Sequence, residues 1–162
     1  MIYRYKATIP GSKTFVREYE IKPETTLFRF NSFILHDLGF SPDQMVLFRG
    51  CGADGKRRSR YGLCDLGDGS MDKVTFAKLI EKEELVLEYC YDLHNDTFIR
   101  LEFIGEAPDS IRYSYPRTTM EKGRNPDQFA RKYVDLDSAE GLGVNISFEM
   151  DAPEEVVDMG DE

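Results

Sequence analysis

The side chains best suited to chemistry lie in one short polar stretch between two apolar runs. Tyr91, Asp92, His94, Asn95 and Asp96 place a phenol, two carboxylates, an imidazole and an amide within six residues. Such groups act as general acids, general bases or ligands when they converge on one substrate position. Short loops, however, tend to turn these side chains outward, where Asp and Asn bond the local main chain. We therefore interpret the stretch first as a hairpin turn and second as a candidate binding site.

A second chemical feature is a run of four cations within five residues, Lys56, Arg57, Arg58 and Arg60, in a stretch rich in glycine. Phosphate groups are suitable ligands for such a run, which makes nucleic acid a possible partner. The 162-residue chain has 21 basic and 30 acidic residues, and 10 of the acids follow Lys132. The remaining 20 acids nearly balance the 21 bases, so the body lacks a broad positive surface. One basic loop alone predicts weak, salt-sensitive binding at most.

Other catalytic and metal-binding patterns are missing from the sequence. His36, His94, Cys51, Cys64 and Cys90 provide no close Cys or His pair. Cys51 and Cys64 flank the glycine-rich stretch and could meet at its base, but two thiols do not complete a zinc site. The chain has no nucleophile elbow, P-loop or dinucleotide fingerprint. We therefore expect no catalytic residue, no cofactor and no bound metal.

Hydrophobic periodicity predicts the elements that position these residues. Residues 2–9 and 14–21 alternate with period two around a Pro-Gly turn, which indicates an opening hairpin. Helical spacing then predicts a helix from Leu27 to Leu38, with Thr25 or Thr26 as its cap and Gly39 as its end. The later elements are a short strand at 45–48, a long loop at 50–70, a short helix capped by Thr75, a second hairpin formed by 85–91 and 97–104 around residues 92–96, a short helix from Asn125-Pro126 through Phe129 and Tyr133, and an edge strand at 144–149.

These elements predict an α+β domain with a bent mixed or antiparallel sheet of about five strands, crossed by one main helix in a β-grasp-like order. We place this domain at residues 1–120. Residues 121–149 form an extension, and residues 150–162, MDAPEEVVDMGDE, form an acidic tail. The tail has few apolar groups, so we expect disorder there.

The cellular setting is also predicted from composition. The first residues alternate charged and apolar side chains rather than forming the apolar core of a signal peptide. No run approaches the roughly 18 apolar residues of a membrane span. An odd number of cysteines in a chain of this size favours reduced thiols. We expect a cytoplasmic protein without membrane contact.

A set of residues over positions 1–120 resembles the plasmid ORF-3-like family, which is named for a reading frame of an Ri plasmid and also occurs as a passenger of insertion elements. The residues that carry the resemblance are Thr26-Leu27, Phe30, Ile34, Gly39-Phe40, Asp43-Gln44, Phe48, Val74-Thr75-Phe76, Leu79-Ile80, Leu87-Glu88-Tyr89 and Tyr91-Asp92.

The resemblance implies an α+β fold around a bent sheet and no established biochemistry. The chain departs from the family at polar positions. Gln44 replaces a usual His, His94 a Gly, Asn95 an Asp and Thr97 a Trp. A shared site built on that His would therefore be altered here.

Three functions follow as hypotheses. The leading one is a non-enzymatic binding module for a protein partner, which contacts it through exposed aromatic side chains or a sheet edge. The second is a nucleic-acid accessory protein of a mobile element that acts through the basic loop. The third is an enzyme, which would require a pocket that gathers Gln44, Asp92 and His94.

Overall fold

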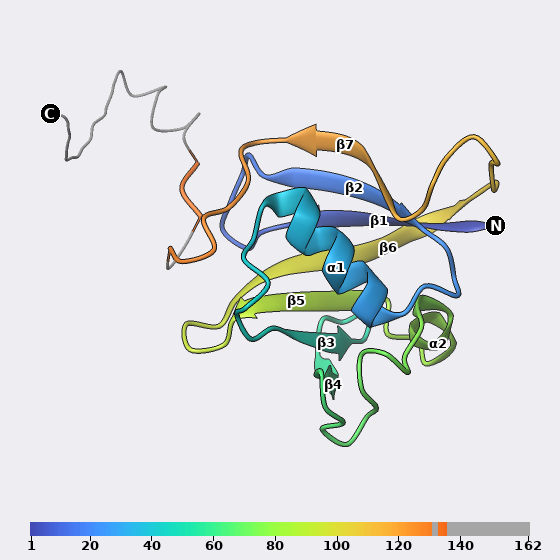
Figure 1. Cartoon of the computed structure of the whole chain (residues 1–162), viewed down its shortest axis with the longest axis horizontal. Helices are drawn as coiled ribbons and strands as arrows, with labels where there is room; N and C mark the ends of the chain where they lie inside the picture. Colours follow the sequence, from blue (N-terminus) through green and yellow to red (C-terminus); the bar gives the residue numbers. More distant parts are fainter. Residues whose placement is uncertain (131–132, 136–162) are drawn as a thin grey trace, which may run out of the picture.

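A seven-stranded sheet forms the body of the computed structural model, which describes residues 1–130 and 133–135 (Figure 1). Its order is β4-β3-β5-β6-β1-β2-β7, and every pairing between neighbours is antiparallel. The elements in chain order are β1 (Ile2–Thr8), β2 (Val16–Ile21), α1 (Leu27–Leu38), β3 (Leu47–Cys51), β4 (Arg57–Tyr61), α2 (Phe76–Glu81), β5 (Val86–Asp92), β6 (Thr97–Ala107) and β7 (Arg117–Lys122).

The prediction of about five strands with one main helix in a β-grasp-like order is wrong. The described residues contain seven strands in an antiparallel sheet and two short helices. The unexpected strands, β4 and β7, are the two edges of the sheet. Edge strands bury little surface, so β4 and β7 lack the apolar alternation by which a strand is recognised.

The bounds of α1, Leu27–Leu38, were predicted correctly, and its sequence explains both ends. The Thr26 side chain accepts a hydrogen bond from the Arg29 amide, and Gly39 ends α1 with φ of 71°. That left-handed conformation suits glycine. The predicted opening hairpin and the hairpin around residues 92–96 are also confirmed, as β1–β2 and β5–β6.

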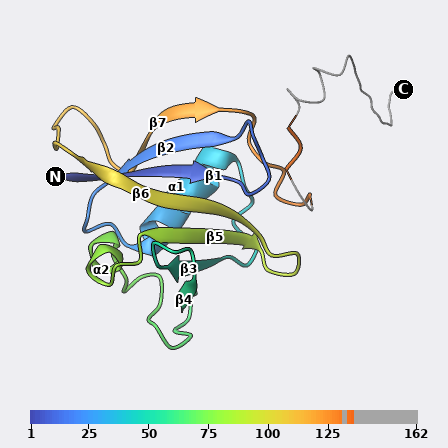
Figure 2. The ribbon, with the colours of Figure 1, turned by 180° about the vertical axis from the view of Figure 1, so that it is seen from behind.

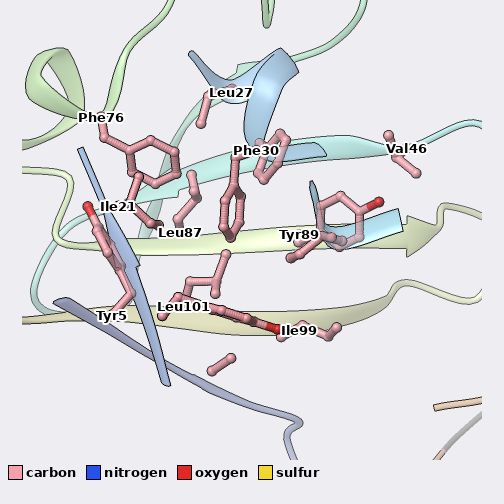
Figure 3. Close-up of a cluster of buried hydrophobic side chains, with 14 of the residues drawn as sticks. Tyr5, Ile21, Leu27, Phe30, Val46, Phe76, Leu87, Tyr89, Ile99 and Leu101 are labelled. Carbon is pink, nitrogen blue, oxygen red and sulfur yellow. The ribbon is translucent and has the colours of Figure 1, made fainter. Parts of the chain in front are cut away.

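The core lies between α1 and one face of the sheet (Figure 3). Phe30 of α1 is fully buried and stands edge-on to Tyr19 and Phe76, with centroids 5.7 and 5.2 Å away. Leu87 and Leu101 from β5 and β6 are also fully buried. Rings at this spacing pack favourably in edge-to-face geometry, in addition to their burial. The fold thus depends on one aromatic layer between helix and sheet.

The opposite face of the sheet is not covered by α1 (Figure 2). Side chains alternate across a strand. Phe48 and Tyr89 point toward the core, so Arg49 and Glu88 point to the opposite face. The two ends of the sheet also differ. The β5–β6 turn and the start of β3 lie at one end, and the β6–β7 connection and the N-terminus lie at the other (Figure 1).

The chain after β7 packs back onto the body without the predicted helix. Residues 125–130 form an irregular turn. The Gln128 side chain is buried and bonds both backbone groups of Ser41, at 2.7 and 3.0 Å. Asp135 accepts from the Ser12 and Thr14 hydroxyls at 2.6 and 2.7 Å. These bonds replace the backbone ladder that a helix would supply.

The domain boundary predicted after residue 120 falls inside β7. The edge strand predicted at 144–149 and the acidic tail predicted at 150–162 lie outside the described residues.

Candidate functional site

The polar residues of the β5–β6 turn first serve the turn itself. One Asp92 oxygen accepts from the Asn95 amide at 3.1 Å, and the other accepts from the Asn95 side chain at 2.8 Å. These bonds lower the pKa of Asp92. Asp96 takes a positive φ of 52°, which Asp tolerates better than most residues. His94 is exposed at the tip of the turn.

Asp96 also links the turn to a cluster on the uncovered face of the sheet. We call Arg49, Arg57, Glu88 and Asp96 the guanidinium cluster. The Nε atoms of Arg49 and Arg57 both donate to Oε1 of Glu88 at 2.8 Å. Their second donors reach the two Asp96 oxygens at 2.6 and 3.2 Å. Two cations are thereby matched by two anions.

Burial makes the central pair of this cluster the more consequential one. The side chains of Arg49 and Glu88 are 11% and 6% exposed, against 45% for Arg57. Burial alone lowers the pKa of Arg49, but the bonds to Asp96 and Glu88 outweigh it and raise that pKa. Burial likewise raises the pKa of Asp96, and its bonds to Arg49 and Arg57 reverse this and lower it. The cluster is a charge-matched structural site.

The basic run forms an edge strand rather than the predicted loop. Residues 57–61 are β4, although they stand within the stretch 50–70 that was expected to have no strand. Arg57 belongs to the guanidinium cluster, and Arg58 donates to the backbone oxygen of Lys82 at 3.1 Å. Lys56 and Arg60 are exposed. Two of the four predicted phosphate ligands thus hold the strand in place.

A buried polar cluster that sequence reasoning did not identify lies on the core side of β4. The Glu84 carboxylate, 2% exposed, accepts from Ser59 Oγ and Tyr61 Oη at 2.6 Å each. Lys82 Nζ lies 2.7 Å from Tyr61 Oη and 3.6 Å from Glu84. Burial and the bond to Glu84 raise the pKa of Tyr61. Gly50 leaves room for this carboxylate, because a Cβ there would lie 2.0 Å from Glu84 Oε1.

A cavity of about 290 Å³ opens beside the β5–β6 turn. We call it the Tyr91 pocket. Its lining residues are Gln44, Met45, Tyr91, Asp92, Leu93, Gln128 and Phe129. Tyr91 is buried, and its ring packs on Phe40 with centroids 4.9 Å apart. The pocket therefore unites the segment before β3, the β5–β6 turn and the chain after β7, three regions that are distant in sequence.

The rim of the Tyr91 pocket is apolar and unusually exposed. Met45 is 71% exposed, Phe129 69% and Leu93 41%. Sequence analysis placed Met45 in a buried strand and Phe129 on a helix. Instead, β3 starts at Leu47, and both side chains stand outside the core. Apolar side chains exposed around one concavity are a feature of interaction sites.

The same pocket has carboxylates in and beside it. Asp92 lines the pocket, whereas Asp43 and Asp127 precede the lining residues Gln44 and Gln128 in the chain. The segments 40–46, 91–94 and 125–130 contain Asp43, Asp92 and Asp127 and no Lys or Arg; residues 131 and 132 lie outside the described part of the chain. Burial, followed by the charges of Asp92 and Asp127, raises the pKa of Tyr91 to about 12. The described segments around the pocket thus carry negative charge.

The candidate enzyme arrangement is only partly assembled. Gln44 and Asp92 line the same pocket, whereas His94 is not among its lining residues. Both oxygens of Asp92 bond Asn95. Within residues 1–130 and 133–135, no three His, Cys, Asp or Glu side chains gather as a metal site. Cys51 and Cys90 are buried, Cys64 is exposed, and all three are free thiols.

Comparison with known proteins supplies the fold and no activity. No protein-family model matches the chain, and no curated protein matches it. Among solved structures, the chain is similar to the crystal structure of MM3350, a protein of unknown function from Methanosarcina mazei Go1. The TM-score is 0.63 at 18% identity, over 74% of this chain and 68% of that one. Such a likeness shows a shared fold, and function must be argued from the site.

One further finding concerns membranes. In the part of the chain that the structure describes, neither helix has the length and apolar character needed to cross a bilayer.

Proposed function

We propose that this protein is a non-enzymatic binding module that captures a peptide segment of a protein partner in the Tyr91 pocket. The observation that carries the proposal is the exposure of Met45, Leu93 and Phe129 around one cavity. Burying such side chains against a partner removes apolar surface from water, at about 25 cal/mol per Å². A second cavity, of about 340 Å³, is lined by residues 9–11 and 95–98 and by Tyr133, and none of these is among the strongly exposed apolar side chains of the described residues.

The chemistry of the ligand follows from the lining. A volume of about 290 Å³ is at the lower end of ligand pockets, so it suits one or two side chains rather than a whole cofactor. The aspartates at positions 43, 92 and 127 favour a neighbouring cation. We propose a segment in which an apolar side chain stands next to Lys or Arg.

Binding is favoured over catalysis by what the polar residues of the pocket do. Asp92 is held by Asn95, and Gln44 has no proton to exchange near neutral pH. We also propose kinship with the plasmid ORF-3-like family. In its support, Gln44 and Asp92, two positions of the resemblance, line one pocket. With Gln in place of the family's usual His, that pocket has no imidazole at this position.

The nucleic-acid alternative has weaker support. Of the four cations in the basic run, Arg57 is paired with Glu88 and Asp96, and Arg58 bonds a backbone oxygen. Lys56 and Arg60 remain exposed on the edge strand. Two charges give little of the counterion release on which nucleic-acid affinity depends. A gel-shift titration in low salt separates the two proposals, because Lys56→Ser with Arg60→Ser weakens only nucleic-acid binding.

Peptide display tests the proposed function. The full chain is immobilised, and a random peptide library is selected on it after depletion on the bare support. We expect enriched peptides to place an apolar residue beside Lys or Arg. Their affinity is measured by fluorescence polarisation. It should be at least about 10-fold lower for Phe129→Asp than for the wild type, as expected when a main contact residue of a small interface is replaced.

Leu63→Asp is the matched control, because Leu63 is 57% exposed in the loop after β4 and does not line the pocket. Peptides should bind this variant as they bind the wild type. A selection without enrichment, or peptides that bind wild type and Phe129→Asp equally, would refute the proposed function.

A further inference from the structure

We infer that one occupant of the Tyr91 pocket is the β6–β7 loop, residues 108–116, of a second copy of this chain. The inference rests on the proposed function, since it names a partner for the same pocket. Its basis is a match between two surfaces at opposite ends of the sheet.

The β6–β7 loop offers the side chains that the pocket favours. Ile111 is fully exposed and Tyr113 is 46% exposed. Arg112, which stands between them, is exposed as well. The Arg117 guanidinium lies 3.7 Å from the centre of the Tyr113 ring. Arg117 is also paired with Glu20, its Nε lying 2.8 Å from Oε1, so Arg112 is the cation that the loop presents beside its apolar tip. Asp109 is the loop's single carboxylate.

The base of this loop is held while its tip projects. Pro116 is buried at the start of β7, and Lys22 Nζ lies 5.9 Å from the centre of the Tyr115 ring. Across the loop, the end of β6 pairs with β1 through Ala107 and Ile2. A loop held at both ends loses less freedom on binding than an unanchored peptide, which favours association.

Charge distinguishes this loop from the other exposed apolar loop. Residues 62–70 also expose two leucines, Leu63 and Leu66. That stretch carries Asp65 and Asp68 and no cation, so Asp92 in the pocket would repel it. The β6–β7 loop presents Arg112 beside Ile111 and therefore complements the aspartates at positions 43, 92 and 127.

Geometry makes the contact intermolecular. β6 begins at the pocket end and runs 11 residues to the loop end, which corresponds to roughly 35 Å at the rise of a strand (Figure 1). The loop therefore does not reach the pocket of its own chain. The contact joins different surfaces of two copies, so it is heterologous. Two copies either close as an antiparallel pair with two such contacts or continue as a row.

Sedimentation velocity tests the inference on the full chain. A small interface with one anchoring side chain requires concentrations from about 10 μM to about 1 mM. We expect the average mass of the wild type to rise over this range. Ile111→Asp and Phe129→Asp should each remain monomeric, because each removes one of the two surfaces. Leu63→Asp should associate as the wild type does.

Mixing the two monomeric variants provides the decisive experiment. Phe129→Asp retains an intact loop, and Ile111→Asp retains an intact pocket, so an equimolar mixture should form dimers and nothing larger. A wild type that stays monomeric at the highest concentration, a variant that still associates, or a mixture that stays monomeric would each overturn the inference. If peptides from the display selection still require Phe129 in that case, the proposed function stands and only the partner is wrong.

Discussion

The guanidinium cluster and the Tyr91 pocket lie on either side of the same β5–β6 turn and follow opposite rules. In the cluster, two buried or half-buried arginines are matched by two carboxylates at 2.6 to 3.2 Å. In the pocket, three apolar side chains are 41 to 71% exposed. A matched set of charges stabilises the fold, whereas exposed apolar side chains are stabilised only when a partner buries them. Polar character therefore marks the structural side of this turn, and apolar character marks the side where we propose that a partner binds.

The largest effect is expected when the cluster loses its central carboxylate. Glu88→Ala leaves Arg49 buried without the buried one of its two anions, so we expect the free energy of unfolding to fall by about 3 kcal/mol or more. Urea denaturation measures this. Arg57→Ala is the control, because its 45% exposed side chain contributes less than about 1 kcal/mol. Equal decreases in the free energy of unfolding of the two variants would show that burial does not determine how much each ion pair contributes to stability.

The buried polar cluster around Glu84 provides a second test of whether a buried carboxylate with its hydrogen-bond partners stabilises the fold. Gly50→Ala brings a Cβ to 2.0 Å from Glu84 Oε1 and 3.2 Å from the Tyr61 ring. Glu84 must then move from its bonds with Ser59 and Tyr61, and we expect destabilisation of about 2 kcal/mol by thermal or urea unfolding. Gly55→Ala has no such contact but strains a φ of 81°, so its loss should be smaller. A neutral Gly50→Ala would contradict the close approach.

The pH dependence of Asp96 should reveal the cluster without disturbing its backbone. Asp96→Asn retains a residue that tolerates positive φ but removes the charge. The folded pKa of Asp96 is lowered, so its contribution is complete above the unfolded value of about 3.9 and is lost as pH falls through the folded pKa. The variant should be less stable than wild type at pH 7, and the difference should shrink below about pH 4. A difference that is constant with pH would contradict ion pairing.

The smallest effect on stability is expected in the pocket. Met45→Ser and Phe129→Asp alter side chains that are 71% and 69% exposed, so each should change the free energy of unfolding by less than about 0.5 kcal/mol. The same Phe129→Asp variant should lose peptide binding. A loss of 2 kcal/mol or so in either variant would mean that these side chains belong to the core after all.

The parts of the fold that sequence predicted are those with strong burial periodicity. The helix from Leu27 to Leu38 and both hairpins have apolar faces that pack against one another in the core, and the helix carries Thr26 and Gly39 at its ends in the expected roles. The edge strands β4 and β7 could not be recognised, because neither alternates between apolar and polar side chains. Asn125-Pro126 resembles a helix start, but Gln128 bonds Ser41 instead of capping a helix.

In the candidate site, too, the features with a local sequence signal were predicted and those that depend on several strands were not. The turn-forming role of Asp92 and Asn95 followed from their types, and their bonds agree with that interpretation. The pairing of Asp96 with Arg49 and Arg57 depends on three strands and has no local signal. Met45 and Phe129 were overlooked because they were assigned to a strand and a helix, and Leu93 because it was treated only as part of a turn. The available signal was that each directly follows a polar residue, Gln44, Asp92 or Gln128.

The β1–β6 register has a practical consequence for handling the protein. Ile2 pairs with Ala107, the last residue before the β6–β7 loop. An affinity tag fused ahead of Met1 would therefore emerge beside that loop and could shield it sterically. Purification with a cleavable leader, followed by its removal, keeps the loop end accessible in every assay of self-recognition.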